Sequence, residues 1–274
     1  MSRSISIGFW MVLVILLGGT SGTFAQTQIN SHITESTTWT LSGSPYILMT
    51  NIQVQSGATL TVDPGVEILF NGNYYLDIRG VLDVNGTEDQ PVLFSGNGSN
   101  YWQYVQFYGA ESSASTVDYA TFERGGRSGY GNVYAYQSSP TFTNCTFQDS
   151  YYYGLYFNQN SAPELTDCII QNNGNPTTAS GLYLVSGSDA TVTNCQFINN
   201  AAYGILSNDV NAIPTIIGST FSGNGNFPVY VPASIAGNLF TTNTFTPRED
   251  GAYNAILING GTITEDQTWD VPPA

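Results

Sequence analysis

Apolar residues recur along the middle of the chain in a sequence repeat of about two dozen residues. The most similar part of the repeat reads "TFTNCTFQDS", "ELTDCIIQNN" and "TVTNCQFINN" in three copies, each with a cysteine at the same position. Measured at that place, successive copies are separated by 25, 23, 27 and 24 residues. The aligned residues are Ala120, Cys145, Cys168, Cys195 and Ser219. A period of this length indicates a repeat architecture in which every copy is one structural unit.

Short alternating segments within each copy are typical of β-strands. The side chains three positions before and two positions after the aligned residue are always apolar. A further segment, earlier in each copy, reads "NVYAY", "GLYFN", "GLYLV", "GILSN" or "PVYVP". The two-residue period of a strand places its first apolar residue on one face and its central residue on the other. The inward residues are then Val133, Leu155, Leu182, Ile205 and Val229.

Three short strands cannot bury their own apolar face, so the copies must stack. Stacking lays each strand parallel on its equivalent in the next copy, about 4.8 Å away. The residue before the aligned position is Asn144, Asp167, Asn194 or Gly218 in the central copies. These residue types tolerate a left-handed backbone, so we expect a ladder of tight turns there.

The three cysteines, Cys145, Cys168 and Cys195, are predicted to form a buried column. The only histidine, His32, is far away in the sequence, and no C-x-x-C pair is present. Metal or redox chemistry would need such partners, so we interpret the thiols as small apolar filler of the core. Stacked Cβ atoms point in the same direction, which disfavours a disulfide bond.

These features resemble the right-handed parallel β-helix of the pectin-lyase-like superfamily. The resemblance rests on "GLYFNQNSAPELTDCIIQNN" and its copies, over about residues 131–231. It implies an all-β solenoid with three short strands in each turn of about 23–27 residues. The right hand follows from the resemblance and from the general chirality of parallel crossovers. The non-catalytic surface or secreted members of bacteria are the most similar type.

The chain is expected to have four parts. Residues 1–25 have a basic residue, a short apolar run and a small-residue end, as in a secretory signal peptide. Residues 26–56 form a lead-in or cap, and residues 57–262 form the parallel β-helix. Residues 263–274 contain "ITEDQTWD", which repeats "ITESTTWT" at 33–40 and indicates a further repeat unit in a truncated chain. A terminal strand that only imitates the first is the alternative.

Composition limits the partners. The formal net charge is −15, and the chain has five basic residues against twenty acidic ones. Nucleic acid is not expected to bind, because phosphate recognition requires clustered positive charge. We expect an exported monomer, secreted or at the cell surface, with no membrane insertion after removal of the signal peptide.

Tyrosines form the most informative surface feature. Alternation turns Tyr134, Tyr156, Tyr183 and Tyr230 outward in a column that Leu206 interrupts. Tyrosine offers an apolar face to a sugar ring and a hydroxyl group to its polar edge. We therefore predict a binding and scaffold module whose partner is a polysaccharide or cell-surface glycan, without catalysis. Rings stacked at strand spacing can also act only as stabilising neighbours within the sheet.

Other functions remain open at this point. The resemblance implies a polysaccharide lyase or glycoside hydrolase as the runner-up, and its best centre would be Arg124, Arg127 and Asp118. The family's Asn-Thr-Asp, Gly-His-Gly and Arg-Ile-Lys motifs are missing, however. No cofactor is predicted, and calcium is possible but has no recognisable binding loop. Paired threonines on a flat sheet would also suit ice binding, but Glu164 and Ile217 interrupt the array.

Overall fold

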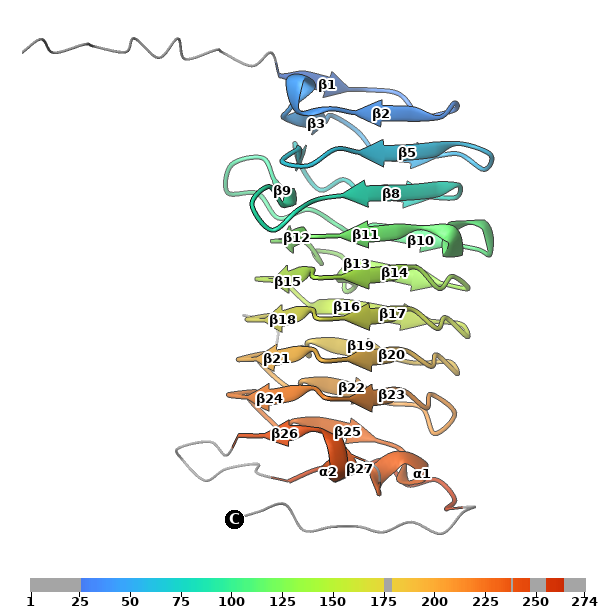
Figure 1. Ribbon diagram of the computed structural model, residues 1–274, viewed down its shortest axis with the longest axis vertical. Coiled ribbons are helices and arrows are strands. Elements are labelled where there is room, and N and C mark those ends of the chain that lie inside the picture. The colour runs from blue at the N-terminus through green and yellow to red at the C-terminus, as the bar shows by residue number, and fades with distance from the viewer. Residues whose placement is uncertain (1–25, 175–178, 238, 247–254, 264–274) are drawn as a thin grey trace, which may run out of the picture.

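The computed structural model describes residues 26–174, 179–237, 239–246 and 255–263. Within these residues the chain winds as a parallel β-solenoid, with coil stacked upon coil along one long axis (Figure 1). Each coil passes through an eight-stranded, a ten-stranded and a nine-stranded sheet in that order. The predicted all-β fold with three strands per turn is confirmed. The expected signal peptide at 1–25 and residues 264–274 lie outside the described residues.

The three sheets are named here by their size. Sheet I, with ten strands, contains β1 (Thr27–Ile29), β3 (Tyr46–Leu48), β6 (Glu67–Phe70), β9 (Val92–Gly96), β12 (Ala120–Glu123), β15 (Thr146–Gln148), β18 (Ile169–Gln171), β21 (Gln196–Ile198), β24 (Thr220–Ser222) and β26 (Thr244–Phe245). Sheet II, with nine strands, contains β4 (Ile52–Val54), β7 (Leu76–Ile78), β10 (Val105–Tyr108), β13 (Gly131–Tyr136), β16 (Tyr153–Asn158), β19 (Leu182–Leu184), β22 (Ile205–Ser207), β25 (Val229–Val231) and β27 (Leu257–Ile258).

Sheet III has eight strands, and each of them precedes a strand of sheet I. It contains β2 (Thr37–Trp39), β5 (Thr59–Val62), β8 (Val81–Asn85), β11 (Thr116–Asp118), β14 (Thr141–Thr143), β17 (Glu164–Thr166), β20 (Thr191–Thr193) and β23 (Thr215–Ile217). Short helices lie at corners and near the C-terminal end: η1 (Leu41–Gly43), η2 (Glu111–Ala114), α1 (Ala233–Ala236) and α2 (Leu239–Thr242). Residues 26–56 already supply β1 to β4, which pair in register with the next coil.

The core is built from columns of equivalent side chains. Phenylalanines stack inside sheet I, where Phe122 pairs with Phe147 and their ring centroids are 5.2 Å apart. The inward residues of sheet II that alternation predicted are fully buried. Each side chain thus completes the burial of the equivalent residue in the next coil, which a single coil cannot do alone.

Tight turns separate sheet III from sheet I where the sequence placed them. Asn144, Asp167, Asn194 and Gly218 all have positive φ, between 54° and 64°. Tyr119 occupies the same position one coil earlier, with φ 47°. Asparagine, aspartate and glycine adopt this conformation at low cost, so their presence at one position fixes the corner of the coil.

The three cysteines lie next to this turn, and all are buried and free. Each thiol donates to the carbonyl oxygen two residues before it, and Cys145 Sγ also lies 3.3 Å from the oxygen of Val117. Hydrogen bonding between the stacked thiols, together with burial, raises the pKa of Cys168 and Cys195. They therefore remain protonated and fill space in the core.

Candidate functional site

Four predicted tyrosines share one column on the outer face of sheet II. Tyr134 pairs with Tyr156, and Tyr156 pairs with Tyr183 in the following coil. Leu206 comes next in the column, followed by Tyr230. Ring centroids are 5.2 Å apart between Tyr134 and Tyr156 and 5.1 Å apart between Tyr156 and Tyr183. The register therefore stacks three phenol rings in consecutive coils.

The ring contacts extend beyond this column. We give the name tyrosine surface to the connected rings of Tyr75, Tyr104, Tyr130, Tyr134, Tyr153, Tyr156 and Tyr183. Tyr136 also contacts Tyr134 and leads on to Tyr108, outside the group named here. Tyr104 packs edge-on against Tyr130 with centroids 5.0 Å apart, and Tyr153 stacks on Tyr183 at 4.6 Å. All its members except Tyr134 keep part of their side chain exposed. The surface is thus two rings wide rather than a single file.

Tyr134 differs from the expected exposed column, because it is only 7% exposed. The rings of Tyr104, Tyr130, Tyr136 and Tyr156 surround it. It therefore supports the neighbouring rings. Tyr230 lies apart from the tyrosine surface, beyond Leu206, where it stacks on Tyr203 and donates a hydrogen bond to Asn259 Oδ1 at 2.9 Å. Within the tyrosine surface, Tyr156 and Tyr183 are thus the two members of the predicted column that remain partly exposed.

Packing also changes the acidity of these phenols. Burial, with a smaller contribution from neighbouring tyrosines, raises the pKa of Tyr104 and of Tyr153 to about 12. Burial likewise raises the pKa of Tyr134 and Tyr156. The hydroxyl groups therefore stay neutral at physiological pH and can both donate and accept hydrogen bonds.

This shift predicts a loss of stability in alkali. A phenol with pKa about 10 when unfolded and about 12 when folded binds its proton more tightly in the folded state. The free energy of unfolding is then constant below pH 10 and falls as pH rises from 10 to 12. Urea denaturation at a series of pH values should show this fall, and Tyr104→Phe should make it shallower. An identical pH dependence in that variant would contradict the assignment.

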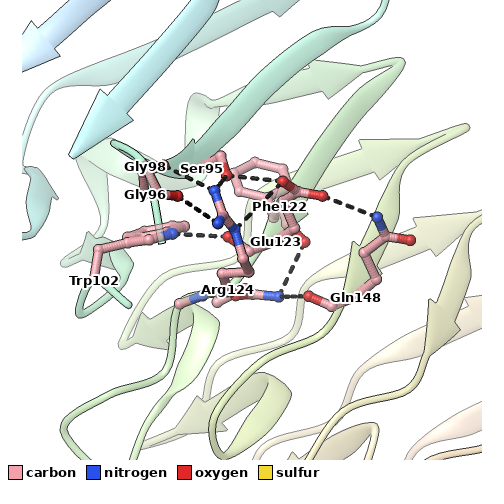
Figure 2. A network of polar contacts seen from close by, with 10 residues as sticks. Ser95, Gly96, Gly98, Trp102, Phe122, Glu123, Arg124 and Gln148 are labelled. Atoms are coloured by element: carbon pink, nitrogen blue, oxygen red, sulfur yellow. Dashed lines mark hydrogen bonds and ion pairs between the residues drawn. The ribbon is translucent and has the colours of Figure 1, made fainter. Parts of the chain in front are cut away.

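The three alternative catalytic residues, Arg124, Arg127 and Asp118, each have different contacts in the structure. Arg124 follows β12 and donates hydrogen bonds from its guanidinium to the carbonyl oxygens of Gly96 and Gly98 (Figure 2). The same group donates to Ser95 Oγ at 2.9 Å, and its Nε lies 3.7 Å from Glu123. A guanidinium that donates to these three oxygens anchors the chain after β9, which is a structural role and unlike that of a base that abstracts protons.

Around Arg124 the contacts continue as a structural network. Glu123 accepts hydrogen bonds from Ser95 Oγ and Gln148 Nε2, while its carbonyl oxygen accepts from the Trp102 indole at 2.8 Å (Figure 2). Trp102 stacks on Phe70 with ring centroids 4.0 Å apart. These contacts fix the segment between β9 and β10 against the coil.

Arg127 and Asp118 lie elsewhere. Arg127 is exposed, and its guanidinium carbon is 5.4 Å from the centre of the Tyr151 ring. Asp118 is on β11 of sheet III, in register with Thr143 and before the turn at Tyr119. Neither of the two ion pairs found among the described residues includes Asp118 or Arg127. Asp118 therefore forms no ion pair with Arg124 or Arg127 within the described residues.

Neither a metal-binding cluster nor a membrane-spanning helix occurs in the described part of the chain. No group of three or more His, Cys, Asp or Glu side chains that could hold a metal ion occurs there. The same residues include no helix that is long and apolar enough to cross a membrane.

A hollow of about 340 Å³ lies in the first coil, lined by residues that include His32, Glu35 and Trp39. His32 uses its Nδ1 there to accept a hydrogen bond from the Gln53 backbone.

One ladder at the corner between sheets I and II was not foreseen. The buried side chains of Asn173, Asn200 and Asn224 occupy equivalent places in three consecutive coils. Each Oδ1 accepts from the backbone N–H of the residue before it in the ladder. The repeated "Asn-Asn" of the sequence was the signal, but only its first residue, at Asn172 or Asn199, has a left-handed backbone.

Comparison with known proteins identifies the family. The family model described as "Right handed beta helix region" matches residues 15–245. Neither the curated proteins nor the solved structures contain a match to the chain. The match covers more than half of the sequence, and the observed parallel solenoid has the architecture that the model describes. The chain therefore belongs to the right-handed β-helix family.

Proposed function

We propose that this protein is an exported, non-catalytic module that binds a neutral polysaccharide along the tyrosine surface. The observation that carries the proposal is the continuous set of ring contacts on the outer face of sheet II, with Tyr156 and Tyr183 partly exposed at its centre. Exposed aromatic groups gathered in one place usually mark a contact surface. Tyrosine combines an apolar face with a polar group, which suits a sugar ring.

The spacing of the coils favours a chain over a single sugar. Tyr104, Tyr134, Tyr156 and Tyr183 come from four successive coils. Three spacings of about 4.8 Å separate these four rings, and Tyr75 in the coil before Tyr104 makes the surface about 19 Å long. A ligand of repeated units can contact several rings at once, so weak contacts with individual rings add up.

Charge favours a neutral ligand. The chain carries a formal net charge of −15, which repels a polyuronate approaching without cations. Tyrosine side chains supply all the groups of the tyrosine surface, and burial raises the pKa of Tyr104 and Tyr153 to about 12, which keeps these two phenols neutral at physiological pH. Uncharged hydroxyl groups are therefore the groups most compatible with this face.

Extracellular location is part of the same proposal. The apolar N-terminal segment with its small-residue end supports export, and a solenoid with long flat faces suits a scaffold at a cell surface. Such a module would hold a glycan without changing it. A monomer is sufficient for this role, since the tyrosine surface is built within one chain.

The test is glycan binding by the double variant Tyr156→Ala with Tyr183→Ala. We expect at least about tenfold weaker binding on an array of neutral polysaccharides, because truncating two contact rings removes about 1.4 kcal/mol or more. Tyr119→Asn is the matched control, since it removes a tyrosine at the corner between sheets III and I and introduces the residue of the equivalent turn at Asn144.

Two outcomes would contradict the proposal. Unchanged binding in the double variant would leave the tyrosines as structural neighbours within the sheet. New reducing or unsaturated ends after incubation with the polysaccharide panel, with or without calcium, would show turnover and support the enzymatic alternative.

A further inference from the structure

A buried carboxylate lies in the same column as the tyrosines, two coils before Tyr134. Asp77 on β7 pairs with Gln106 on β10, and Gln106 pairs with Tyr134. On its other side Asp77 pairs with Gln53 of β4. Asp77 is only 4% exposed. The outer face of sheet II thus changes from aromatic to polar along one line.

Only one carboxylate oxygen of Asp77 has a partner. Its Oδ2 accepts from Gln53 Nε2 and from Arg79 Nε, both at 2.8 Å. Its Oδ1 is buried and has no hydrogen-bond partner among the described residues. A buried carboxylate oxygen without a partner costs free energy, on the order of 1–3 kcal/mol. Folded proteins seldom retain such a group without a use for it.

Aromatic residues precede and follow the Asp77 column along the strands. Strand alternation turns Tyr75, Asp77 and Arg79 outward from β7, and Tyr104, Gln106 and Tyr108 outward from β10. Tyr75 and Tyr104 stack with centroids 5.4 Å apart. On the other side Tyr108 lies beneath the guanidinium of Arg79, 3.5 Å from its carbon, and stacks on Tyr136. The column of Gln53, Asp77 and Gln106 therefore runs between two stacks of aromatic rings.

The charges at this place cancel locally. Arg79 and Asp77 form an ion pair at 2.8 Å, so the carboxylate does not attract a free cation as an isolated acid would. The unused Oδ1 remains a strong hydrogen-bond acceptor, because it is part of an ionised group. The Asp77–Arg79 pair has no net charge and lies beside aromatic rings. Its remaining acceptor oxygen therefore matches a hydroxyl group of a neutral sugar.

We infer that Asp77 forms the polar end of the tyrosine surface and accepts a hydrogen bond from one hydroxyl group of the bound neutral polysaccharide. This inference rests on the proposed function and names the group that the ligand must present. Gln106 is the adjacent residue in the column, and its side chain makes no hydrogen bond within the described residues. The inference requires that rotation of this side chain, which costs no hydrogen bond, opens Oδ1 to the ligand.

Asp77→Asn reverses the hydrogen bonding of this position without changing its shape. Gln53 and Arg79 both donate, so the amide oxygen must take the place of Oδ2, and the amide NH2 group then replaces Oδ1. Binding of neutral hexasaccharides of β-1,4-linked glucose, xylose or mannose should weaken at least about tenfold, as expected when a charged acceptor is lost. Asp83→Asn on β8 of sheet III is the matched control and should bind normally.

A series of single-deoxy oligosaccharides identifies the hydroxyl group. Removing the recognised hydroxyl should weaken binding to the unchanged protein about tenfold and should have little further effect on Asp77→Asn, because the two changes remove the same contact. This readout separates recognition from stability, since a purely structural Asp77 would respond equally to all deoxy sugars. Should Asp77→Asn not fold, the deoxy series on the unchanged protein decides alone.

The outcomes separate this inference from the proposed function. If the tyrosine double variant loses binding while Asp77→Asn binds normally and lowers only the melting temperature, Asp77 is structural and the inference fails alone. If no single hydroxyl matters, the inference fails as well. If the unchanged protein binds none of the hexasaccharides and no array glycan, both proposals fail.

Discussion

Replacing Asn200 with alanine is expected to lower the free energy of unfolding by about 3–5 kcal/mol, because it leaves buried polar groups in two neighbouring coils without partners. The side chain accepts from the backbone N–H and the side-chain NH2 of Asn173, at 3.2 and 3.0 Å. It donates to the Ile170 carbonyl and to Asn224 Oδ1, both at 3.0 Å. Alanine keeps the backbone but removes all four hydrogen bonds.

The matched control is Asn199→Gly. Asn199 is the adjacent asparagine, but it is exposed and has a φ of 53°, and Gly223 occupies its equivalent place in the next coil. Glycine adopts this backbone readily, so the control should change stability by less than about 1 kcal/mol. Urea denaturation of both variants gives the comparison. Equal effects of the two substitutions would contradict the role assigned to the buried ladder.

Local opening of the solenoid around Asn200 is a further expected consequence of the alanine substitution. Each coil of a solenoid contacts only its neighbours, so the lost free energy is concentrated at one interface. Hydrogen exchange should therefore speed up most in β18 and β21, the strands that precede Asn173 and Asn200, and least in β5 and β8. Uniform acceleration along the chain would instead indicate a single cooperative unit.

The sequence was sufficient for the stacking and for the faces of the strands. Val133, Leu155 and Leu182 are inward because strand alternation has only two outcomes and the apolar one must be buried. Asn144 and Asn194 marked a turn, since few residue types favour a left-handed backbone. Local rules decide both features, so a single chain suffices to predict them.

Residue type alone could not distinguish the two asparagines of "Asn-Asn". Asn199 and Asn200 are adjacent and chemically identical, but one turns the exposed backbone and the other fills a buried place. The difference depends on where the donors of neighbouring coils lie. That information arises only after the coils have stacked.

The full extent of the tyrosine surface also could not be predicted from the sequence. Tyr130 lies just before β13 and Tyr153 begins β16, after corners of different length. Their rings contact the predicted column in the folded structure, but no regular sequence spacing relates them to it. Arg124 illustrates the same limit, because its partners Gly96 and Gly98 belong to the preceding coil. Contacts between corners of unequal length have no fixed spacing that a pattern can show.

Truncation of Phe147 to alanine is the second large expected effect, a loss of about 3–5 kcal/mol in the free energy of unfolding. Phe147 is fully buried in sheet I and continues the stack of Phe94 and Phe122, whose centroids are 4.4 Å apart. Its ring also packs edge-on against Phe142, at 5.4 Å. Alanine would leave a cavity in a column of rings that cannot close without moving the backbone of two coils.

Phe147→Ile separates burial from ring stacking. Ile170 is in register with Phe147 in the next coil, so isoleucine already has a place in this column. Isoleucine retains much of the buried apolar area, and we expect a cost of about 1–2 kcal/mol, below that of alanine. Urea denaturation monitors both variants. If isoleucine proves as costly as alanine, ring contacts stabilise the column more than burial does, and the break at Ile170 then marks a weak interface within the solenoid.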